Sequence, residues 1–258
     1  SLSIADILTY LYFHRLNIDP KNPQWEDRDR LVMSKGHAAP AYYSVLAHRG
    51  YFPVEELKTL RKSDSRLQGH PNMRTVPGVD ASTGSLGQGI SVAVGMALGA
   101  KLSGKSFRVY TILGDGEIQE GQVWEAAMYA CAKGLDNLVA VVDNNNLQID
   151  GTIAEVNSPY PIAEKFKAFG WNSTATAWRR SPPPSTSAMP PRTASPSACM
   201  PTPSRARAFP SWRISAHGTA KLRTKSSTKK LWKSSMRLSQ ALKPTNFSER
   251  NVVLWQIL

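Results

Sequence analysis

The chain has 258 residues, of which 41% are hydrophobic, with 32 Lys and Arg and 19 Asp and Glu. This length suits one large domain or two small ones. Its two cysteines, Cys131 and Cys199, are too few for a disulfide framework or a cysteine-built zinc site and fit a reducing compartment, so we expect a cytoplasmic protein. The longest apolar run, residues 90–100, is too short to cross a bilayer, and the start does not resemble a signal peptide. No membrane partner is therefore expected.

The positive charge of the chain is concentrated in one part of it. Residues 1–172 hold 17 Lys and Arg against 18 Asp and Glu, whereas residues 173–258 hold 15 Lys and Arg against the single acid Glu249. The tail is also rich in Ser, Pro and Arg and poor in patterned apolar residues, so it cannot bury enough surface to fold by itself. We predict a boundary at residue 172, with an ordered domain before it and a poorly ordered basic tail after it.

The first predicted element is an amphipathic helix over residues 4–15. Apolar side chains recur near helical spacing at Ile4, Ile7, Leu8, Leu11 and Phe13. Because the chain begins with Ser1, directly before this helix, we expect that an N-terminal piece is missing. From Leu31 a short apolar run leads into a Ser-Lys-Gly-His turn and then a periodic segment ending near Gly50, which places His37 at the entrance of a helix.

The middle of the chain predicts a βαβ unit. A glycine-rich segment opens a helix of small side chains near residue 88. Residues 107–113 are typical of a buried strand, 120–133 of a helix closed by Gly134, and 138–142 of a second strand. Consecutive strands linked by a helix are parallel, so we expect an α/β fold with a parallel sheet.

Polar and glycine residues follow both strands of this unit. Gly114, Asp115 and Gly116 come after the first strand, and an Asp-Asn-Asn-Asn run at 143–146 follows the second. The carboxyl ends of neighbouring parallel strands meet at one edge, where glycines let a phosphate approach backbone N–H groups. The dinucleotide motif is absent because Gln119 occupies the third glycine position, and no P-loop sequence is present.

Asp115 points to a divalent cation at this edge. A carboxylate between two phosphate-binding glycines would repel the ligand unless a cation lay between them. Asp115 and Asn145 offer side-chain oxygens, and the carbonyl of Leu147 could add a third, a donor set that suits Mg²⁺ or Ca²⁺. The alternative is that Gly-Asp-Gly is only a turn between strand and helix, with Asp115 as its cap.

At this point the motifs identify a family. GDG followed thirty residues after its Asp by NN resembles the thiamine-diphosphate motif. The segments SLSIADILTYLY, RDRLVMSKGHAAPAYYSVLA, GHPN, STGSLGQGISVAVGMALG and GDGEIQEGQVWEAA resemble the N-terminal, diphosphate-binding domain of transketolase. The resemblance covers residues 1–172 and is to the split form, in which the two halves are separate chains. It implies a three-layer α/β fold with a mainly parallel sheet.

The resemblance also implies roles for individual residues. Asp115, Asn145 and the Leu147 carbonyl would hold the cation, and Gly116 would lie against the diphosphate. His37 and His70 would face cofactor and substrate as catalytic residues, with Glu120 as a third catalytic residue at the subunit interface. The expected cofactor-binding residues are His37, Gly84, Ser85, Leu86, Gly114, Asp115, Gly116, Glu117 and Asn145.

The activity implied by the resemblance is transfer of a two-carbon ketol unit from a ketose phosphate to an aldose phosphate, with thiamine diphosphate and Mg²⁺ or Ca²⁺ as cofactors. The family's activating glutamate lies in the pyrimidine-binding domain, which this chain lacks, and its GHxGG segment would precede Ser1. We therefore expect the chain to be inactive alone and to need a C-terminal transketolase half, in a dimer or heterotetramer.

The tail after Asn172 departs abruptly from the family, and a shifted reading frame accounts for this. The segment RAFPSWR at 207–213 can be encoded so that the shifted frame reads GVSFME, and neighbouring segments also regain text like that of the family. The basic charge of the tail is then no evidence for a nucleic-acid partner. The alternatives are another thiamine-diphosphate enzyme, such as deoxyxylulose-phosphate synthase or a 2-oxoacid dehydrogenase component, or a non-catalytic remnant whose basic tail binds nucleic acid.

Overall fold

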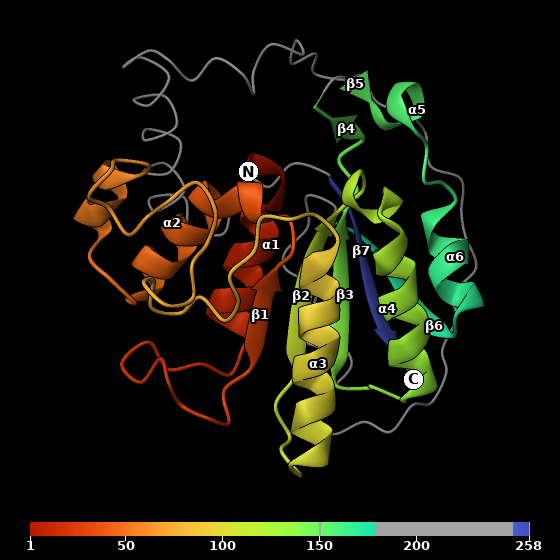
Figure 1. Cartoon of the computed structure of the whole chain (residues 1–258), viewed down its shortest axis with the longest axis horizontal. Helices are drawn as coiled ribbons and strands as arrows, with labels where there is room; N and C mark the ends of the chain where they lie inside the picture. The colour runs from red at the N-terminus through yellow and green to blue at the C-terminus, as the bar shows by residue number, and fades with distance from the viewer. Residues whose placement is uncertain (150, 179–249, 258) are drawn as a thin grey trace.

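The computed structural model describes residues 1–149, 151–178 and 250–257. Its main sheet has five strands in the order β1-β2-β3-β7-β6, and a two-stranded sheet pairs β4 with β5 (Figure 1). The strands are β1 (Arg30–Met33), β2 (Val109–Gly114), β3 (Leu138–Asp143), β4 (Leu147–Gln148), β5 (Gly151–Thr152), β6 (Trp171–Trp178) and β7 (Arg250–Ile257). The α-helices are α1 (Ala5–Tyr10), α2 (Ala39–Arg49), α3 (Gln88–Leu102), α4 (Gly121–Ala132), α5 (Ile153–Val156) and α6 (Ile162–Ala168), with short helical turns η1 (Leu2–Ile4), η2 (Leu11–Arg15), η3 (Gly36–Ala38), η4 (Val54–Thr59) and η5 (Glu117–Gln119).

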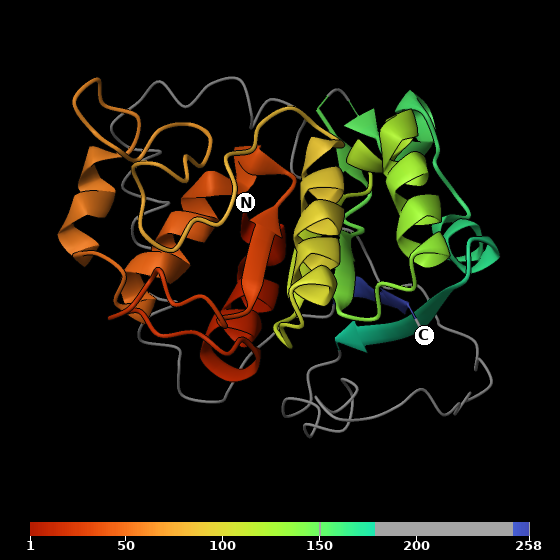
Figure 2. The same cartoon turned by 60° about the horizontal axis from the view of Figure 1, so that its bottom comes forward.

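The sheet separates two hydrophobic cores, which makes the fold three-layered as expected. On one face, Tyr110, Ile112, Val139 and Val141 pack against α1, η2 and α2. The strand residues that alternate with them pack against α3, α4 and α6 on the other face. This alternation follows from the period of two along a strand that is buried on both sides. Figures 1 and 2 show α3 and α4 side by side over the second face.

The predicted βαβ unit is confirmed. Strands β2 and β3 pair in parallel over six residues, and α4 connects them. Strand β1 pairs in parallel with β2 on the other side, so the short apolar run before the Ser-Lys-Gly-His turn is a third parallel strand. The first predicted helix is also present, as η1, α1 and η2 in succession, of which η2 is a π-helical turn.

Strand β7 differs from the expectation for the tail. Residues 250–257 pair antiparallel with both β3 and β6, inside the five-stranded sheet. Part of the predicted tail is therefore a strand of the main sheet. The physical reason is that the segment RNVVLWQI is rich in β-branched and apolar residues, and the edge of β3 offers unpaired backbone groups. Residues 173–178 of the predicted tail belong to β6, while residues 179–249 and 258 lie outside the described residues, and the boundary at 172 stays a prediction.

Three aromatic side chains, Trp124, Phe166 and Trp171, pack together in the second core beside α4. The indole of Trp171, only 1% exposed, donates its Nε1 hydrogen to the carbonyl of Ala127 at 2.9 Å. Phe166 lies between the two indoles, with ring centroids 5.5 Å from Trp171 and 5.2 Å from Trp124. These contacts fasten α4 and α6 to the start of β6. Within the described part of the chain, every helix is too short or too polar to cross a bilayer.

Candidate functional site

The two predicted ligand loops meet at the carboxyl edge of the sheet. Gly114 pairs with Asp143 at the last position of the β2–β3 ladder, and the N–H of Asp115 donates to the carbonyl of Asp143 at 3.3 Å. The N–H of Asn146 then donates to Oδ2 of Asp115 at 2.7 Å, which ties the loop after β3 to the Asp115 side chain. The sequence prediction that these loops come together is confirmed.

Asp115 carries a negative charge that no neighbouring side chain neutralises. The residue is 1% exposed, and its Oδ1 accepts a hydrogen bond from the N–H of Gly116 at 2.9 Å. No ion pair to Asp115 exists among the described residues, and burial raises the pKa of its carboxyl group. A buried carboxylate without a cation is costly, so this geometry fits a carboxylate that completes its environment by binding a metal.

The other two predicted ligands lie in the loop after β3 that Asn146 joins to Asp115. The Asn145 amide group donates through Nδ2 to Asp143 at 3.1 Å, and its Oδ1 accepts from the N–H of Leu147 at 2.9 Å. Leu147 is 55% exposed and pairs with Thr152 between β4 and β5. One carboxylate, one amide and one carbonyl form a hard-oxygen set of the kind that Mg²⁺ and Ca²⁺ take. The described residues contain no cluster of three or more His, Cys, Asp or Glu, so further ligands would have to come from phosphate oxygens and water.

The carboxylate of Asp143 is neutralised within the chain, in contrast to that of Asp115. Nζ of Lys35 lies 2.6 Å from its Oδ2, both side chains are almost fully buried, and Oγ of Ser3 donates to the same oxygen at 2.6 Å. Burial alone would raise the pKa of Asp143, but the Lys35 ammonium lowers it below its ordinary value. The Ser-Lys-Gly-His turn after β1 is thus linked to the end of β3, two strands away.

The two predicted histidines lie on neighbouring loops. His37 stands in η3 at the entrance of α2, as predicted, and is exposed. Burial of part of the ring and the charge of Lys35 lower the pKa of His37 to about 4, and His70 also contributes to this shift. His37 is therefore neutral at pH 7 and able to accept a hydrogen bond or a proton. The ring of His70 packs against Gly84, where an added Cβ would lie 3.0 Å from its Cγ.

The Gly-Ser-Leu-Gly-Gln-Gly segment packs directly on the Ser-Lys-Gly-His turn. A Cβ added at Gly36 would lie 2.8 Å from the backbone nitrogen of Gly84. Ser85 is exposed and Leu86 is 36% exposed, so both predicted cofactor contacts are accessible. Gly87 has φ of 81°, a left-handed conformation that favours glycine, and directly precedes α3. The structure thus brings the segments around His37, His70 and Gly84 together.

The structure places the remaining predicted residues in three different settings. Gly116 is half-buried, and the side chain of Gln148 lies over it, 3.2 Å from where a Cβ would be. Glu120 is exposed at the N-cap position of α4 beside Gly87, without a side-chain capping hydrogen bond, which suits the predicted interface position. Glu117 is 3% exposed, and both of its oxygens accept hydrogen bonds from this chain. Its predicted cofactor contact is therefore not supported by the geometry, because the carboxylate is already used inside the protein.

Sequence reasoning missed Ser34, Lys35 and Asp143 as parts of the site. Ser34 donates its hydroxyl hydrogen to Oε1 of Glu117, and Lys35 pairs with Asp143. The available signals were the position of Ser34 and Lys35 within the Ser-Lys-Gly-His turn and that of Asp143 in the polar run at 143–146. A buried pair of residues 108 positions apart leaves no local pattern.

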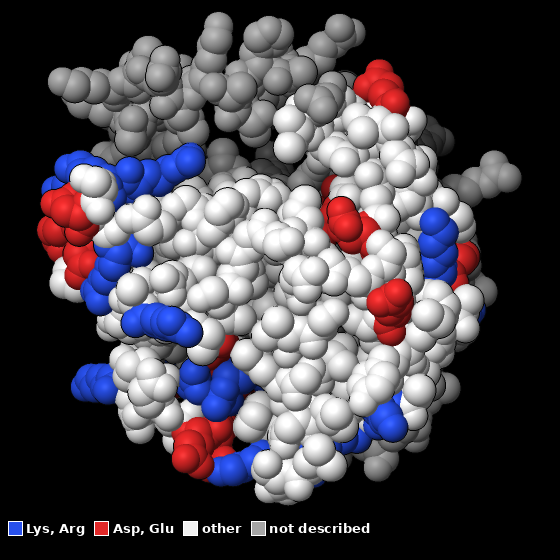
Figure 3. All heavy atoms as spheres, in the orientation of Figure 1, with Lys and Arg blue, Asp and Glu red and all other residues white. Residues whose placement is uncertain are grey.

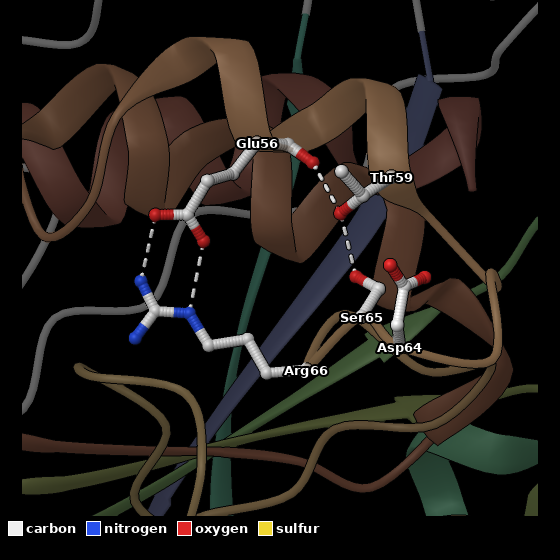
Figure 4. A pocket seen from close by; sticks show the side chains of 5 residues that line it. All are labelled: Glu56, Thr59, Asp64, Ser65 and Arg66. Carbon is white, nitrogen blue, oxygen red and sulfur yellow. Dashed lines mark hydrogen bonds and ion pairs between the residues drawn. The ribbon is translucent and has the colours of Figure 1, made fainter.

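A pocket lies beside η4, away from the loops that carry the predicted site residues. It has a volume of about 470 Å³ and is lined by Glu56, Thr59, Asp64, Ser65 and Arg66. Figure 4 shows the Arg66 guanidinium held by both carboxylate oxygens of Glu56, each at 2.9 Å. None of the predicted site residues lines this pocket.

Comparison with known proteins gives a consistent result. Residues 1–181 match the family described as "Transketolase, thiamine diphosphate binding domain". The 6-deoxy-6-sulfo-D-fructose transketolase subunit SqwG of a Clostridium species is 52% identical over 172 residues, which cover 67% of this chain and 62% of that protein. An apulose-4-phosphate transketolase subunit from Actinobacillus succinogenes is 47% identical over 169 residues, covering 66% of this chain and 61% of that one. The matched part of this chain thus spans about three fifths of these relatives.

Solved structures of transketolases share the fold. A Campylobacter jejuni transketolase is 39% identical with a TM-score of 0.59, over 65% of this chain and 27% of that one. A Pichia stipitis transketolase variant is 37% identical with a TM-score of 0.61, over 64% of this chain and 26% of that one. The resemblance and the α/β fold predicted from the sequence are both confirmed. This chain belongs to the family of transketolase domains that bind thiamine diphosphate.

Proposed function

We propose that this chain is the diphosphate-binding half of a split transketolase that moves a two-carbon ketol unit from a ketose phosphate to an aldose phosphate. The observation that carries the proposal is the buried, unneutralised carboxylate of Asp115, joined to the Asn145 loop at the edge of a parallel sheet. Asp115, Asn145 and the Leu147 carbonyl would hold Mg²⁺ or Ca²⁺, and Gly116 would lie against the diphosphate. Asp115 is thus a metal ligand in this proposal rather than a turn residue only.

The chain's own residues would position the substrate and handle protons. When bound, thiamine diphosphate supplies a nucleophilic carbon and an electron sink for the two-carbon unit. His37 and His70 lie on adjoining loops with imidazoles suited to bind sugar oxygens and to exchange protons with them. A neutral His37 can accept a proton from a substrate hydroxyl, which is the role we assign to it. Glu120, exposed beside Gly87, would act at the interface with a second subunit.

Exposed apolar side chains on the site loops support the need for a partner. Leu86, Leu147, Ile149 and Met73 are 36%, 55%, 74% and 53% exposed, and each follows or belongs to one of the motif segments. Figure 3 also shows a broad surface without charged side chains over α3 and the neighbouring loops. White in Figure 3 includes uncharged polar side chains, so the apolar character rests on the four exposed residues, and exposed apolar surface around a site is typical of an interface. We assign it to a C-terminal transketolase half that carries the pyrimidine pocket, in a dimer or heterotetramer.

The substrate class is proposed only as sugar phosphates. The names of the two bacterial relatives refer to different compounds, a sulfo-fructose and apulose 4-phosphate. Residues that distinguish such sugars are expected on the partner half, which would close the site from the other side. A cytoplasmic location remains our expectation.

A reconstitution experiment tests the proposed function. The chain, as it stands and with the reading frame restored after residue 172, is mixed with a C-terminal transketolase half, thiamine diphosphate and Mg²⁺. We expect the frame-restored mixture to form sedoheptulose 7-phosphate from xylulose 5-phosphate and ribose 5-phosphate, and the chain alone to be inactive. Turnover by the frame-restored chain alone, or an inactive mixture that still binds cofactor, would contradict the proposal.

Substitution of the metal ligand provides the matched control. We expect Asp115→Asn to abolish turnover in the mixture and cofactor binding in calorimetry. Asp136→Asn makes the same chemical change at an exposed position before β3, at the opposite edge of the sheet, and should leave both unchanged. Equal loss in both variants would show that the effect is not specific to the site.

A further inference from the structure

Glu117 is a buried carboxylate that joins three separate segments of the chain. It begins η5, immediately after the Gly-Asp-Gly turn, and is 3% exposed. Its Oε1 accepts the hydroxyl hydrogen of Ser34 and the N–H of Gly87, the latter at 2.9 Å. Its Oε2 accepts the N–H of Gly114, also at 2.9 Å. One side chain therefore contacts the end of β1, the start of α3 and the end of β2.

Each of the three partners belongs to a different motif of the candidate site. Ser34 opens the Ser-Lys-Gly-His turn, Gly87 lies in the Gly-Ser-Leu-Gly-Gln-Gly segment, and Gly114 opens Gly-Asp-Gly. The first two of these segments are closely packed, because a Cβ added at Gly89 would lie 2.5 Å from Oγ of Ser34. The hydrogen bonds of Glu117 therefore fix the relative positions of loops that are already in close contact.

The three donors account for the presence of a carboxylate at this buried position. The Glu117 side chain is buried, and its three hydrogen bonds offset the cost of removing a carboxylate from water. No side-chain cation forms an ion pair with Glu117 among the described residues. Hydrogen bonds to a charged acceptor are roughly twice as strong as neutral ones, so each loop gains from contact with this group. A glutamine would direct its N–H₂ group toward at least one of these donors and could not accept hydrogen bonds from all three.

We propose that Glu117 is a positioning residue, which sets the spacing of the Ser-Lys-Gly-His, Gly-Ser-Leu-Gly-Gln-Gly and Gly-Asp-Gly segments without touching the cofactor itself. The carboxylate holds these segments in the arrangement that receives the diphosphate and its cation. The effect of Glu117 on cofactor binding rests on the proposed function, whereas its effect on the spacing of the loops does not.

Hydrogen exchange of the full chain, without cofactor, tests the loop arrangement directly. We expect Glu117→Gln to speed exchange of the amides of Gly87 and Gly114 about tenfold or more, because each loses part of its acceptor. Peptides from the far end of α4 should exchange at the rate of the unmodified chain. The control Glu125→Gln changes an exposed glutamate on α4 and should alter neither set. Uniform acceleration throughout the chain, or none at Gly87 and Gly114, would overturn the proposal.

A second variant keeps the test informative if Glu117→Gln does not fold. Ser34→Ala removes only one of the three donors and leaves the carboxylate in place. We expect faster exchange at Gly87 and Gly114, smaller than in Glu117→Gln, because the loosened carboxylate holds both amides less well. Where both single variants fold, their effects should not add in the double variant, since Ser34 acts through Glu117. No change in Ser34→Ala, or fully additive effects, would contradict the shared role.

Cofactor affinity then separates positioning from general stability. In the frame-restored chain with its partner half, we expect Glu117→Gln to raise the Kd for thiamine diphosphate with Mg²⁺ about tenfold, with a smaller loss in kcat at saturating cofactor. Glu117→Asp, which keeps the charge, should recover part of the affinity. An unchanged Kd would overturn the effect on binding. If the unmodified protein binds no cofactor, the proposed function fails while the exchange result still stands.

Discussion

The two aspartates at the carboxyl edge of the sheet differ in how their charge is compensated. Asp143 ends β3 and is neutralised by Lys35 at 2.6 Å, with a further hydrogen bond from Ser3. Asp115 follows β2, is equally buried, and has only backbone N–H donors from Gly116 and Asn146. The chain itself neutralises the charge of Asp143. The surroundings of Asp115, with backbone donors alone, suit an added cation. In the proposed function, Asp143 is a structural carboxylate and Asp115 is the one that binds the cation.

The largest expected effect comes from making Asp143 resemble Asp115. Lys35→Met leaves a buried carboxylate without its cation, so we expect the free energy of unfolding to fall by about 3–5 kcal/mol in urea denaturation of the full chain. The double variant Lys35→Met with Asp143→Leu removes both charges and should recover most of this loss. A single variant as stable as the unmodified chain would show that the pair is not needed.

A smaller loss is expected from crowding the turn that carries Lys35. In Gly89→Ala the added Cβ would meet atoms of Ser34 at 2.5–2.6 Å, so we expect a loss of about 1–3 kcal/mol. Gly95→Ala, in the same helix, meets nothing within 4 Å and should stabilise the chain by about 0.5–1 kcal/mol. Thermal unfolding of the two variants measures the contrast. Equal unfolding temperatures of the two variants would mean that the Ser-Lys-Gly-His turn is loosely packed.

Asp115 itself should matter for binding rather than for stability. Asp115→Asn removes a charge that burial disfavours but loses one acceptor, so we expect the free energy of unfolding to change by less than about 1 kcal/mol. In the chain paired with its partner half, thiamine diphosphate with Mg²⁺ should raise the Tm of the unmodified protein and leave that of the variant unchanged. A shift of the same size in both would exclude Asp115 as a metal ligand.

The smallest effect concerns the pH dependence of stability through His37. Its pKa is lowered to about 4 in the fold, below the ordinary value, so the unfolded chain binds the proton more readily. The stability that neutral His37 contributes is present above its unfolded pKa and is lost as the pH falls toward about 4. Because His37 is exposed, solvent screening keeps the effect small. NMR titration of its imidazole should give a midpoint near 4.

His37→Gln provides the stability measurement for the same group. Between about pH 6.5 and pH 4, this variant should lose less stability than the unmodified chain. His14→Gln, at another exposed histidine, is the matched control for the substitution itself. A midpoint for His37 near its ordinary value would contradict the predicted crowding of the turn.

Much of the fold and of the candidate site could be predicted because it is encoded locally. The strand ending at Gly114 and the strand ending at Asp143 are linked by one helix, so their parallel pairing follows from chain order. The contacts of Glu117 with Ser34 and Gly87 could not be predicted, since they join residues 83 and 30 positions apart. Strand β7 was missed for the same reason, because its partners in β3 lie more than 100 positions earlier.

The aromatic side chains beside α4 include a fluorescent indole close to the candidate site. Trp124 lies in the first turns of α4, four residues after Glu120, and its ring centroid is 5.2 Å from that of Phe166. A small displacement of the start of α4 would change the packing of this indole, and with it the wavelength and intensity of its emission. The neighbouring Trp171, 1% exposed and hydrogen-bonded to Ala127, packs against the middle of the same helix. Because the chain has seven tryptophans, comparison with Trp124→Phe would isolate the emission of Trp124 and with it movements at the ligand-binding edge.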